Sequence, residues 1–221
     1  MAESLLKVLA KELRRRYPDI DKVVDEMRSR DPFELLVLTE LSQITSSKNL
    51  WTAFNRLRDS VGTSPESLAG SDVKAIEEAI KPAGLWRIRA RRLKELAEEV
   101  LERFGGSLRS LGRLSTEELR EELLKLPGVG VKTADVVALF SFGRPVMPVD
   151  THIRRIAIRL GLVPPNAKYE EIRRVLEEGL RGEDLAFMHI ALIRFGREVC
   201  KARSPRCHAC PIRGLCPSSK G

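Results

Sequence analysis

The chain has 221 residues, of which 43% are hydrophobic and 32% charged, as in globular proteins with one sizeable core or two modest ones. The sequence contains no apolar run of the roughly 18 residues that a membrane span needs, nor the basic and apolar runs of a signal peptide, so we expect a cytoplasmic protein. The 39 basic residues outnumber the 31 acidic ones, and this excess favours a polyanionic partner such as nucleic acid.

Helical periodicity runs through almost the whole chain. Asp31 and Pro32 predict the N-cap and first residue of a buried helix, and Ser115 to Glu118 forms a capping box that opens another. Trp86 to Phe104 predicts one long helix, which the glycines after it end. The sequence shows no alternating strand pair and no internal repeat, so we predict an all-α fold. Further helices are expected at about 50–61, 131–142, 151–161, 168–180 and 183–199.

A glycine-containing turn, Pro127-Gly128-Val129-Gly130, joins two of these helices. Glycine allows positive φ angles and a close approach of the backbone to another molecule. The helix that starts near Val131 directs its first N–H groups outward, where a phosphate can sit. A plain tight connection is the alternative. The Leu-Pro before the turn and the Lys-Thr after it favour a helix-hairpin-helix that binds phosphate.

The hairpin sequence LPGVGVKTADVV, with Val-Asp-Thr-His-Ile at 149–153, resembles the endonuclease III family of helix-hairpin-helix DNA glycosylases. The resemblance extends from about residue 30 to Cys216. It implies two helical domains with damaged double-stranded DNA bound in the cleft between them, and a monomer. We expect a six-helix domain at 23–136, with the helix-hairpin-helix at about 116–142 on its border, and a second domain formed by 1–22 and 137–221. Gly128, Val129, Gly130 and Val131 would contact the DNA.

The same resemblance implies that Lys132 attacks C1′ of the damaged nucleotide and that Asp150 assists. Lys132 falls in the first turn of its helix, where the helix dipole disfavours the charged ammonium, as an amine nucleophile requires. A solvated lysine at a helix start is the alternative. Asp150 directly precedes an apolar-periodic helix and is equally suited to be its N-cap, a role that can coexist with catalysis. His152 lines either the cleft or only the start of that helix.

All four cysteines lie near the end of the chain, in the pattern C-x6-C-x2-C-x5-C. Without an export signal, metal ligation is favoured over disulfides. A four-thiolate zinc site is the generic alternative, but it is usually built from two C-x2-C pairs, and this chain has one. The spacing matches the iron–sulfur loop of the endonuclease III family at every interval. We therefore expect a [4Fe-4S] cluster on Cys200, Cys207, Cys210 and Cys216, with phosphate contacts from Arg203, Arg206 and Arg213.

Two segments resemble those with which the family fills the space left by an extruded base. Gln43, in Leu-Ser-Gln-Ile-Thr, would enter that space, and Leu85 would wedge into the opposite side. The alternatives are a polar residue at a helix end and a core leucine. Gln43 is also the chain's only glutamine, a scarcity of amides that is typical of heat-adapted proteins. We interpret the arginine run at positions 87, 89, 91 and 92 as a solvated helix face and His189 as a core residue.

Two positions depart from the commonest forms of the family, because Ser46 and Asp135 stand where aspartate and asparagine are frequent. The leading hypothesis is a glycosylase and AP lyase that removes oxidised or reduced pyrimidines through a lysine Schiff base and β-elimination. A mismatch-specific adenine or thymine/uracil glycosylase is the nearest alternative, although such enzymes typically carry another residue at the position of Lys132. A non-catalytic DNA-binding module and a zinc-stapled interaction protein are alternatives from other classes.

Overall fold

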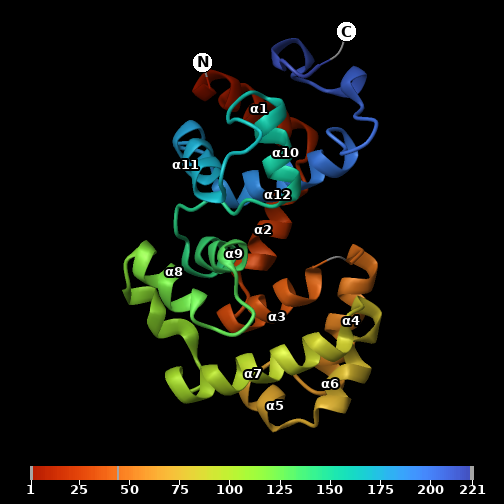
Figure 1. Cartoon of the computed structure of the whole chain (residues 1–221), viewed down its shortest axis with the longest axis vertical. Coiled ribbons are helices and arrows are strands. Elements are labelled where there is room, and N and C mark those ends of the chain that lie inside the picture. Colours follow the sequence, from red (N-terminus) through yellow and green to blue (C-terminus); the bar gives the residue numbers. More distant parts are fainter. Residues whose placement is uncertain (1, 44, 220–221) are drawn as a thin grey trace. The chain divides into compact units, whose positions relative to one another are not determined.

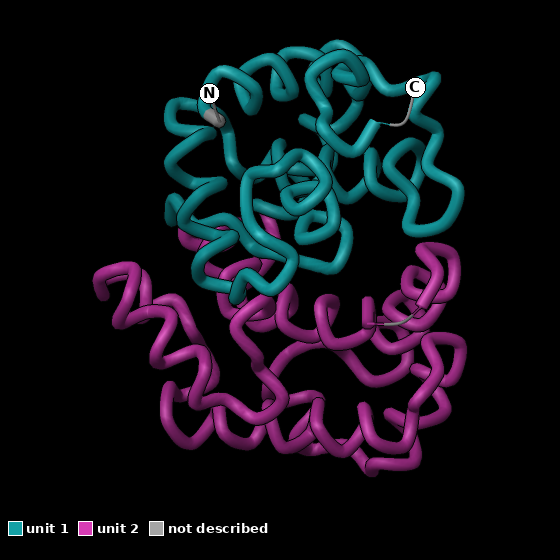
Figure 2. Tube along the Cα trace, turned by 45° about the horizontal axis from the view of Figure 1, so that its top comes forward, with its two compact units in different colours: residues 1–28, 143–221 teal, residues 29–142 magenta. Residues whose placement is uncertain are grey.

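The computed structural model describes residues 2–43 and 45–219, and within these ranges the chain forms α-helices and short 3-10 turns without a strand. The all-α prediction is confirmed. The chain divides into two compact units, which Figure 2 distinguishes by colour. Unit 1 comprises Met1–Arg28 and Gly143–Gly221, and unit 2 comprises Ser29–Phe142.

Unit 2 is built around α3, whose residues from Pro32 to Leu41 are all buried except the half-buried Glu34. Because α3 is apolar all round, it can serve as the centre of a helical core. It packs against α4, α7 and α9, while α5 and α6 cover α7 from another side (Figure 1). The elements of this unit are α3 (Pro32–Ser42), α4 (Ser47–Ser60), α5 (Pro65–Gly70), α6 (Val73–Ile80), η1 (Lys81–Ala83), α7 (Trp86–Phe104), η2 (Leu108–Arg113), α8 (Thr116–Leu124) and α9 (Val131–Phe142).

Local signals at the helix starts of unit 2 are confirmed. The carboxylate of Asp31 accepts a hydrogen bond from the amide of Phe33 at 2.9 Å, ahead of Pro32. Ser115 and Glu118 form the predicted capping box, with each side chain bonded to the backbone of the other. Such caps accept hydrogen bonds from the first amides of a helix, which have no acceptor within the helix. Short polar residues in the sequence therefore mark where these helices begin.

Unit 1 is built around α12, which packs against α10, α2 and α1, while α11 packs against α1. At the α1–α11 contact a Cβ on Gly179 would lie 2.3 Å from Leu6, so the glycine lets the two helices approach closely. The elements are α1 (Ala2–Arg16), α2 (Ile20–Arg28), α10 (Thr151–Arg159), α11 (Tyr169–Gly179), α12 (Leu185–Glu198), η3 (Cys207–Ala209) and η4 (Arg213–Leu215).

The borders of the units differ from the expected domain borders. The expected borders, after residues 22 and 136, fall inside α2 and α9, whereas the units divide after Arg28 and Phe142 and leave both helices whole. Unit 2 therefore contains seven described α-helices, α3 to α9, rather than six. In the part of the chain that the structure describes, no helix has the length and apolar character needed to cross a membrane.

Candidate active site and metal-binding loop

The turn between α8 and α9 is a tight hairpin anchored by a buried leucine. Leu126 is 2% exposed, and its carbonyl accepts a hydrogen bond from the amide of Val129 at 3.2 Å. Gly128 has a φ of 76°, which favours glycine, whereas Gly130 lies outside the left-handed region. The sequence suggested a positive φ angle at both Gly128 and Gly130, and the structure has one only at Gly128. Gly128, Gly130 and Val131 are exposed, so the hairpin offers its backbone to the surroundings.

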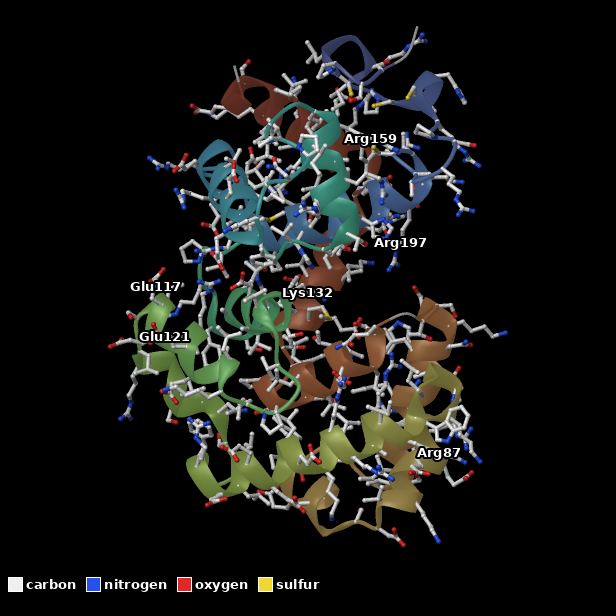
Figure 3. All side chains as sticks on the ribbon, viewed as in Figure 1. Arg87, Glu117, Glu121, Lys132, Arg159 and Arg197 are labelled. Atoms are coloured by element: carbon white, nitrogen blue, oxygen red, sulfur yellow. The ribbon has the colours of Figure 1, made fainter. Side chains whose placement is uncertain are left out.

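Lys132 is the second residue of α9 and directly follows this exposed turn (Figure 3). Its side chain is half-buried, whereas the residues from Thr133 to Phe140 are buried in the core of unit 2. The lysine thus projects from the beginning of a rigid helix whose remaining length is fixed by packing. A reactive group on such an element is positioned more precisely than one on a loop.

Asp150 is the N-cap of α10, as predicted, and belongs to unit 1. Its Oδ1 accepts a hydrogen bond from the amide of Ile153 at 2.8 Å. The segment before it is buried and held on both sides: the carbonyl of Pro148 lies 3.1 Å from Nδ1 of His189, and the amide of Val149 donates to the hydroxyl of Tyr169 at 3.2 Å. Asp150 therefore stands at a fixed place with its side chain half-buried.

His152 lies against α12. A Cβ on Gly196 would be 2.8 Å from the Cβ of His152, so this glycine makes room for the histidine. Nδ1 of His152 is 3.0 Å from Nη2 of Arg155, which also donates to the carbonyl of Gly196 at 2.9 Å. Burial lowers the pKa of His152 below its ordinary value of 6.5, although the charge of Asp150 opposes the shift. His189 is buried, as expected.

Gln43 and Leu85 are both exposed in unit 2. Gln43 follows the last residue of α3, and its Nε2 donates to Oε2 of the buried Glu40 at 2.9 Å. Leu85 is 57% exposed and has a left-handed backbone with φ of 51°, which is uncommon for a residue other than glycine. Leu85 is therefore not the core leucine considered as an alternative. Ile44 of the quoted segment lies outside the described residues.

The arginine run at the start of α7 is not wholly a solvated face. Arg87 and Arg91 are exposed, but Arg89 is only 2% exposed. The reason is helical spacing: Arg89 lies four residues before Leu93 and continues the inward stripe of Leu93, Leu96 and Val100. That stripe is visible in the sequence and could have identified Arg89 as buried.

The four cysteines are free of disulfides and line one cavity of about 620 Å³ in unit 1. Burial raises the pKa of the Cys210 thiol, and the charges of the other three cysteines act in the same direction. Nη1 of Arg159 donates to Sγ of Cys200 at 3.4 Å. In the described residues, no three His, Cys, Asp or Glu side chains are grouped closely enough for a single metal ion. A cavity of this size, walled by four sulfur donors, fits a polynuclear iron–sulfur group.

Comparisons with known proteins agree with this geometry. Residues 37–181 match the HhH-GPD superfamily of base excision DNA repair proteins, and residues 200–216 match the iron-sulfur binding domain of endonuclease III. The chain is 36% identical over 190 residues to an endonuclease III of Sulfolobus acidocaldarius, and this alignment covers 86% of the chain and 83% of that protein. It is also 34% identical over 215 residues to an endonuclease III of Thermotoga maritima. That alignment covers 96% of this chain and 92% of the relative.

Solved structures show the same relationship. A trapped covalent intermediate of endonuclease III with DNA superposes with a TM-score of 0.82 at 29% identity, over 99% of this chain and 97% of that one. A thermostable thymine-DNA glycosylase, at 24% identity and a TM-score of 0.82, has the same fold.

Proposed function

Because the chain belongs to the HhH-GPD superfamily of base excision DNA repair proteins, with endonuclease III relatives over most of its length, we propose that Lys132 is its nucleophile. The chain is a DNA glycosylase with AP lyase activity, and damaged double-stranded DNA is its substrate. The observation that carries the proposal is the placement of Lys132, half-buried on the first turn of α9 and directly after an exposed glycine hairpin.

The reaction begins when the neutral Nζ of Lys132 attacks C1′ of the damaged nucleotide. The bond from C1′ to the base breaks, and the base departs with the electron pair. The sugar ring opens to give an iminium linkage between Nζ and C1′, which acidifies the hydrogens on C2′. Loss of a C2′ proton then expels the 3′ phosphate by β-elimination and cuts the strand. This sequence needs an amine that is unprotonated and positioned, which a helix start favours.

Asp150 provides the negative charge in this scheme. Its carboxylate stabilises the positive charge that develops on the sugar or accepts the proton of the attacking amine. The hydrogen bond from the amide of Ile153 uses Oδ1 and keeps the carboxylate in a fixed place. Asp150 thus has a structural and a catalytic role at once.

The remaining contacts to DNA are assigned from the resemblance, and all of these residues except the half-buried Val129 and His152 are exposed. Gly128, Val129, Gly130 and Val131 present backbone to a phosphate at the start of α9. Gln43 enters the space left by the extruded nucleotide, and Leu85 wedges into the opposite side; both side chains are exposed. His152 follows Asp150 on α10 and lines the same part of the site.

The chain binds an iron–sulfur cluster. We assign Cys200, Cys207, Cys210 and Cys216 as its ligands, because all four line one cavity. When bound, the cluster supplies iron–thiolate bonds that close residues 200–216 into a fixed loop. Arg203, Arg206 and Arg213 are exposed on that loop and are available to phosphates.

The lesion class is an oxidised or reduced pyrimidine, and the enzyme acts as a monomer inside the cell. The lesion class and the monomer rest on the resemblance to endonuclease III, and the location inside the cell rests on a substrate, DNA, that is found there.

Borohydride trapping tests the proposal. The protein is incubated with duplex DNA that contains thymine glycol or an abasic site, and borohydride is added to reduce any Schiff base. We expect a covalent adduct with the wild-type chain and none with Lys132→Gln. An adduct of wild-type yield in the variant would reject Lys132 as the nucleophile. Release of the base without any adduct would instead indicate a monofunctional glycosylase.

A further inference from the structure

The side chain of Arg89 connects two segments of unit 2 that are distant in sequence. Its Nη1 donates to the carbonyl of Ala83 at 2.8 Å and to that of Leu41 at 3.4 Å. Its Nη2 donates to the carbonyl of Gln43. One buried guanidinium therefore holds the end of α3 and the end of η1 at the same time.

The backbone of Arg89 adds a further bond on the other side of the same turn. Its amide donates to the carbonyl of Leu85 at 3.1 Å, while its side chain holds Ala83. The segment that these two hydrogen bonds enclose contains Gly84, with φ of 75°, and Leu85, with φ of 51°. Glycine adopts a positive φ readily, but a leucine in the left-handed region persists only where the surroundings fix it. Arg89 supplies bonds on both sides of the strained Leu85.

An arginine suits this place better than other residues. The pKa of Arg89 is lowered by burial, although the charge of Glu40 works in the opposite direction, so the buried position disfavours the charge. The guanidinium compensates by donating in fixed directions from separate nitrogen atoms. A lysine at this position has one nitrogen and cannot reach both segments with the same geometry.

We propose that Arg89 is a positioning residue that holds Gln43 and Leu85 at a fixed separation, so that both side chains enter the duplex as a preformed pair. This inference rests on the roles assigned to Gln43 and Leu85 above. Arg89 is too deeply buried to contact DNA itself. Its effect is to remove the cost of ordering two exposed segments at the moment of binding.

The test compares a substrate in which the lesion is paired and stacked with one in which it is not. Thymine glycol is placed either in a fully paired duplex or in a short unpaired bubble, and single-turnover rates of base release are measured. The variants are Arg89→Lys, Arg89→Met and the control Arg91→Met, which alters an exposed arginine of the same helix. A double variant with Gln43→Ala and Leu85→Ala is measured alone and combined with Arg89→Lys.

We expect Arg89→Lys to slow base release about tenfold or more on the paired duplex and about twofold or less in the bubble, where no stack has to be filled. The double variant should show the same pattern, and adding Arg89→Lys to it should bring little further loss, because coupled residues are not additive. Arg91→Met should match the wild-type chain on both substrates.

Equal losses on both substrates would show that Arg89 only maintains the fold and would overturn the inference. So would fully additive losses or an unimpaired Arg89→Lys variant. If Arg89→Met fails to fold, Arg89→Lys still tests the inference, because base release from the bubble substrate shows whether the Arg89→Lys protein is folded and active. The double variant, which retains Arg89, separately tests the roles assigned to Gln43 and Leu85. If those roles are wrong, the double variant releases the base from the paired duplex at the wild-type rate. That result would also overturn the inference.

Discussion

Arg120 of α8 and Asp135 of α9 form an ion pair of 2.5 Å that joins the two helices flanking the hairpin. Asp135 is completely buried, and the side chain of Arg120 is 12% exposed. The resemblance drawn from the sequence marked Asp135 as a departure from the commonest form. In this chain Asp135 is a structural residue that fixes α9, and with it Lys132, relative to α8.

Breaking this pair should destabilise unit 2. Arg120→Met leaves the Asp135 carboxylate buried without its cation, which costs about 3–5 kcal/mol of unfolding free energy. Arg120→Met with Asp135→Leu should recover part of that loss, because no charge is then left buried. Urea unfolding measures both, with Arg87→Met as an exposed control (Figure 3). An unchanged stability in Arg120→Met would show that the ion pair contributes nothing.

Asp150 can be separated into its two roles by substitution. Asp150→Asn keeps an oxygen that caps Ile153, so the Tm should stay close to wild type while base release is abolished. Asp150→Ala loses the cap as well, and its stability should fall by about 1 kcal/mol. Thermal unfolding and single-turnover base release are measured on both. Full activity of Asp150→Asn would leave the cap as the only role of this residue.

The parts of the fold that were predicted from sequence are those with local causes. The bounds of α7, the capping box at Ser115 and the cap at Asp150 follow from periodicity and from side chains that satisfy their own helix. The cysteine spacing identified a metal-binding loop because four thiols so close in sequence have few other uses.

Other features depend on contacts between segments distant in the chain and were missed. The burial of Arg89 was missed because charged residues are normally exposed, although the apolar stripe of α7 passes through its position. The carbonyl groups of Leu41 and Gln43 that bind its guanidinium lie on a distant segment and have no signal in the sequence. The left-handed φ of Leu85 likewise has no sequence signal, since leucine rarely adopts it. The borders of the two compact units differ from the expected domain borders, because periodicity does not show which core a helix such as α9 joins.

The strain at Leu85 predicts opposite changes in stability and activity. Leu85→Gly removes a Cβ from a left-handed backbone and loses little burial, because the side chain is 57% exposed. We expect stability to stay level or rise by roughly 0.5–1 kcal/mol. Base release from paired duplex should fall. Leu85→Ala is the matched control, since it removes the side chain but keeps the strained Cβ. A Leu85→Gly variant less stable than Leu85→Ala would contradict the strain.

The cysteine loop should depend on its metal. Cys210→Ala removes one of the sulfurs around the cavity, so the broad visible absorption of an iron–sulfur protein should be lost and unit 1 should be destabilised. Absorption spectra and iron analysis check this, with Ser218→Ala as a control that alters the cavity wall but no sulfur. A colourless wild-type protein with stoichiometric zinc would overturn the assignment of iron.

His152 gives unit 1 a dependence on pH whose sign follows from its burial. Burial lowers its pKa in the folded chain, against the charge of Asp150, while Arg155 and Arg197 act in the same direction as burial. Between that lowered pKa and the ordinary value of 6.5, the unfolded chain binds more protons than the folded one. Stability therefore falls as the pH decreases through this window, and above it the histidine is neutral in both states and has no effect.

The matched variant is His152→Asn, whose amide oxygen can still accept from Arg155 but does not titrate. Urea unfolding at about pH 7.5 and about pH 5.5 gives the loss of stability for each protein across the window. The wild-type chain should lose more than the variant, because carboxylates and other histidines titrate equally in both and cancel in the difference. An equal loss in both proteins would mean that His152 is not buried as a neutral ring against α12, and its position beside Gly196 would have to be revised.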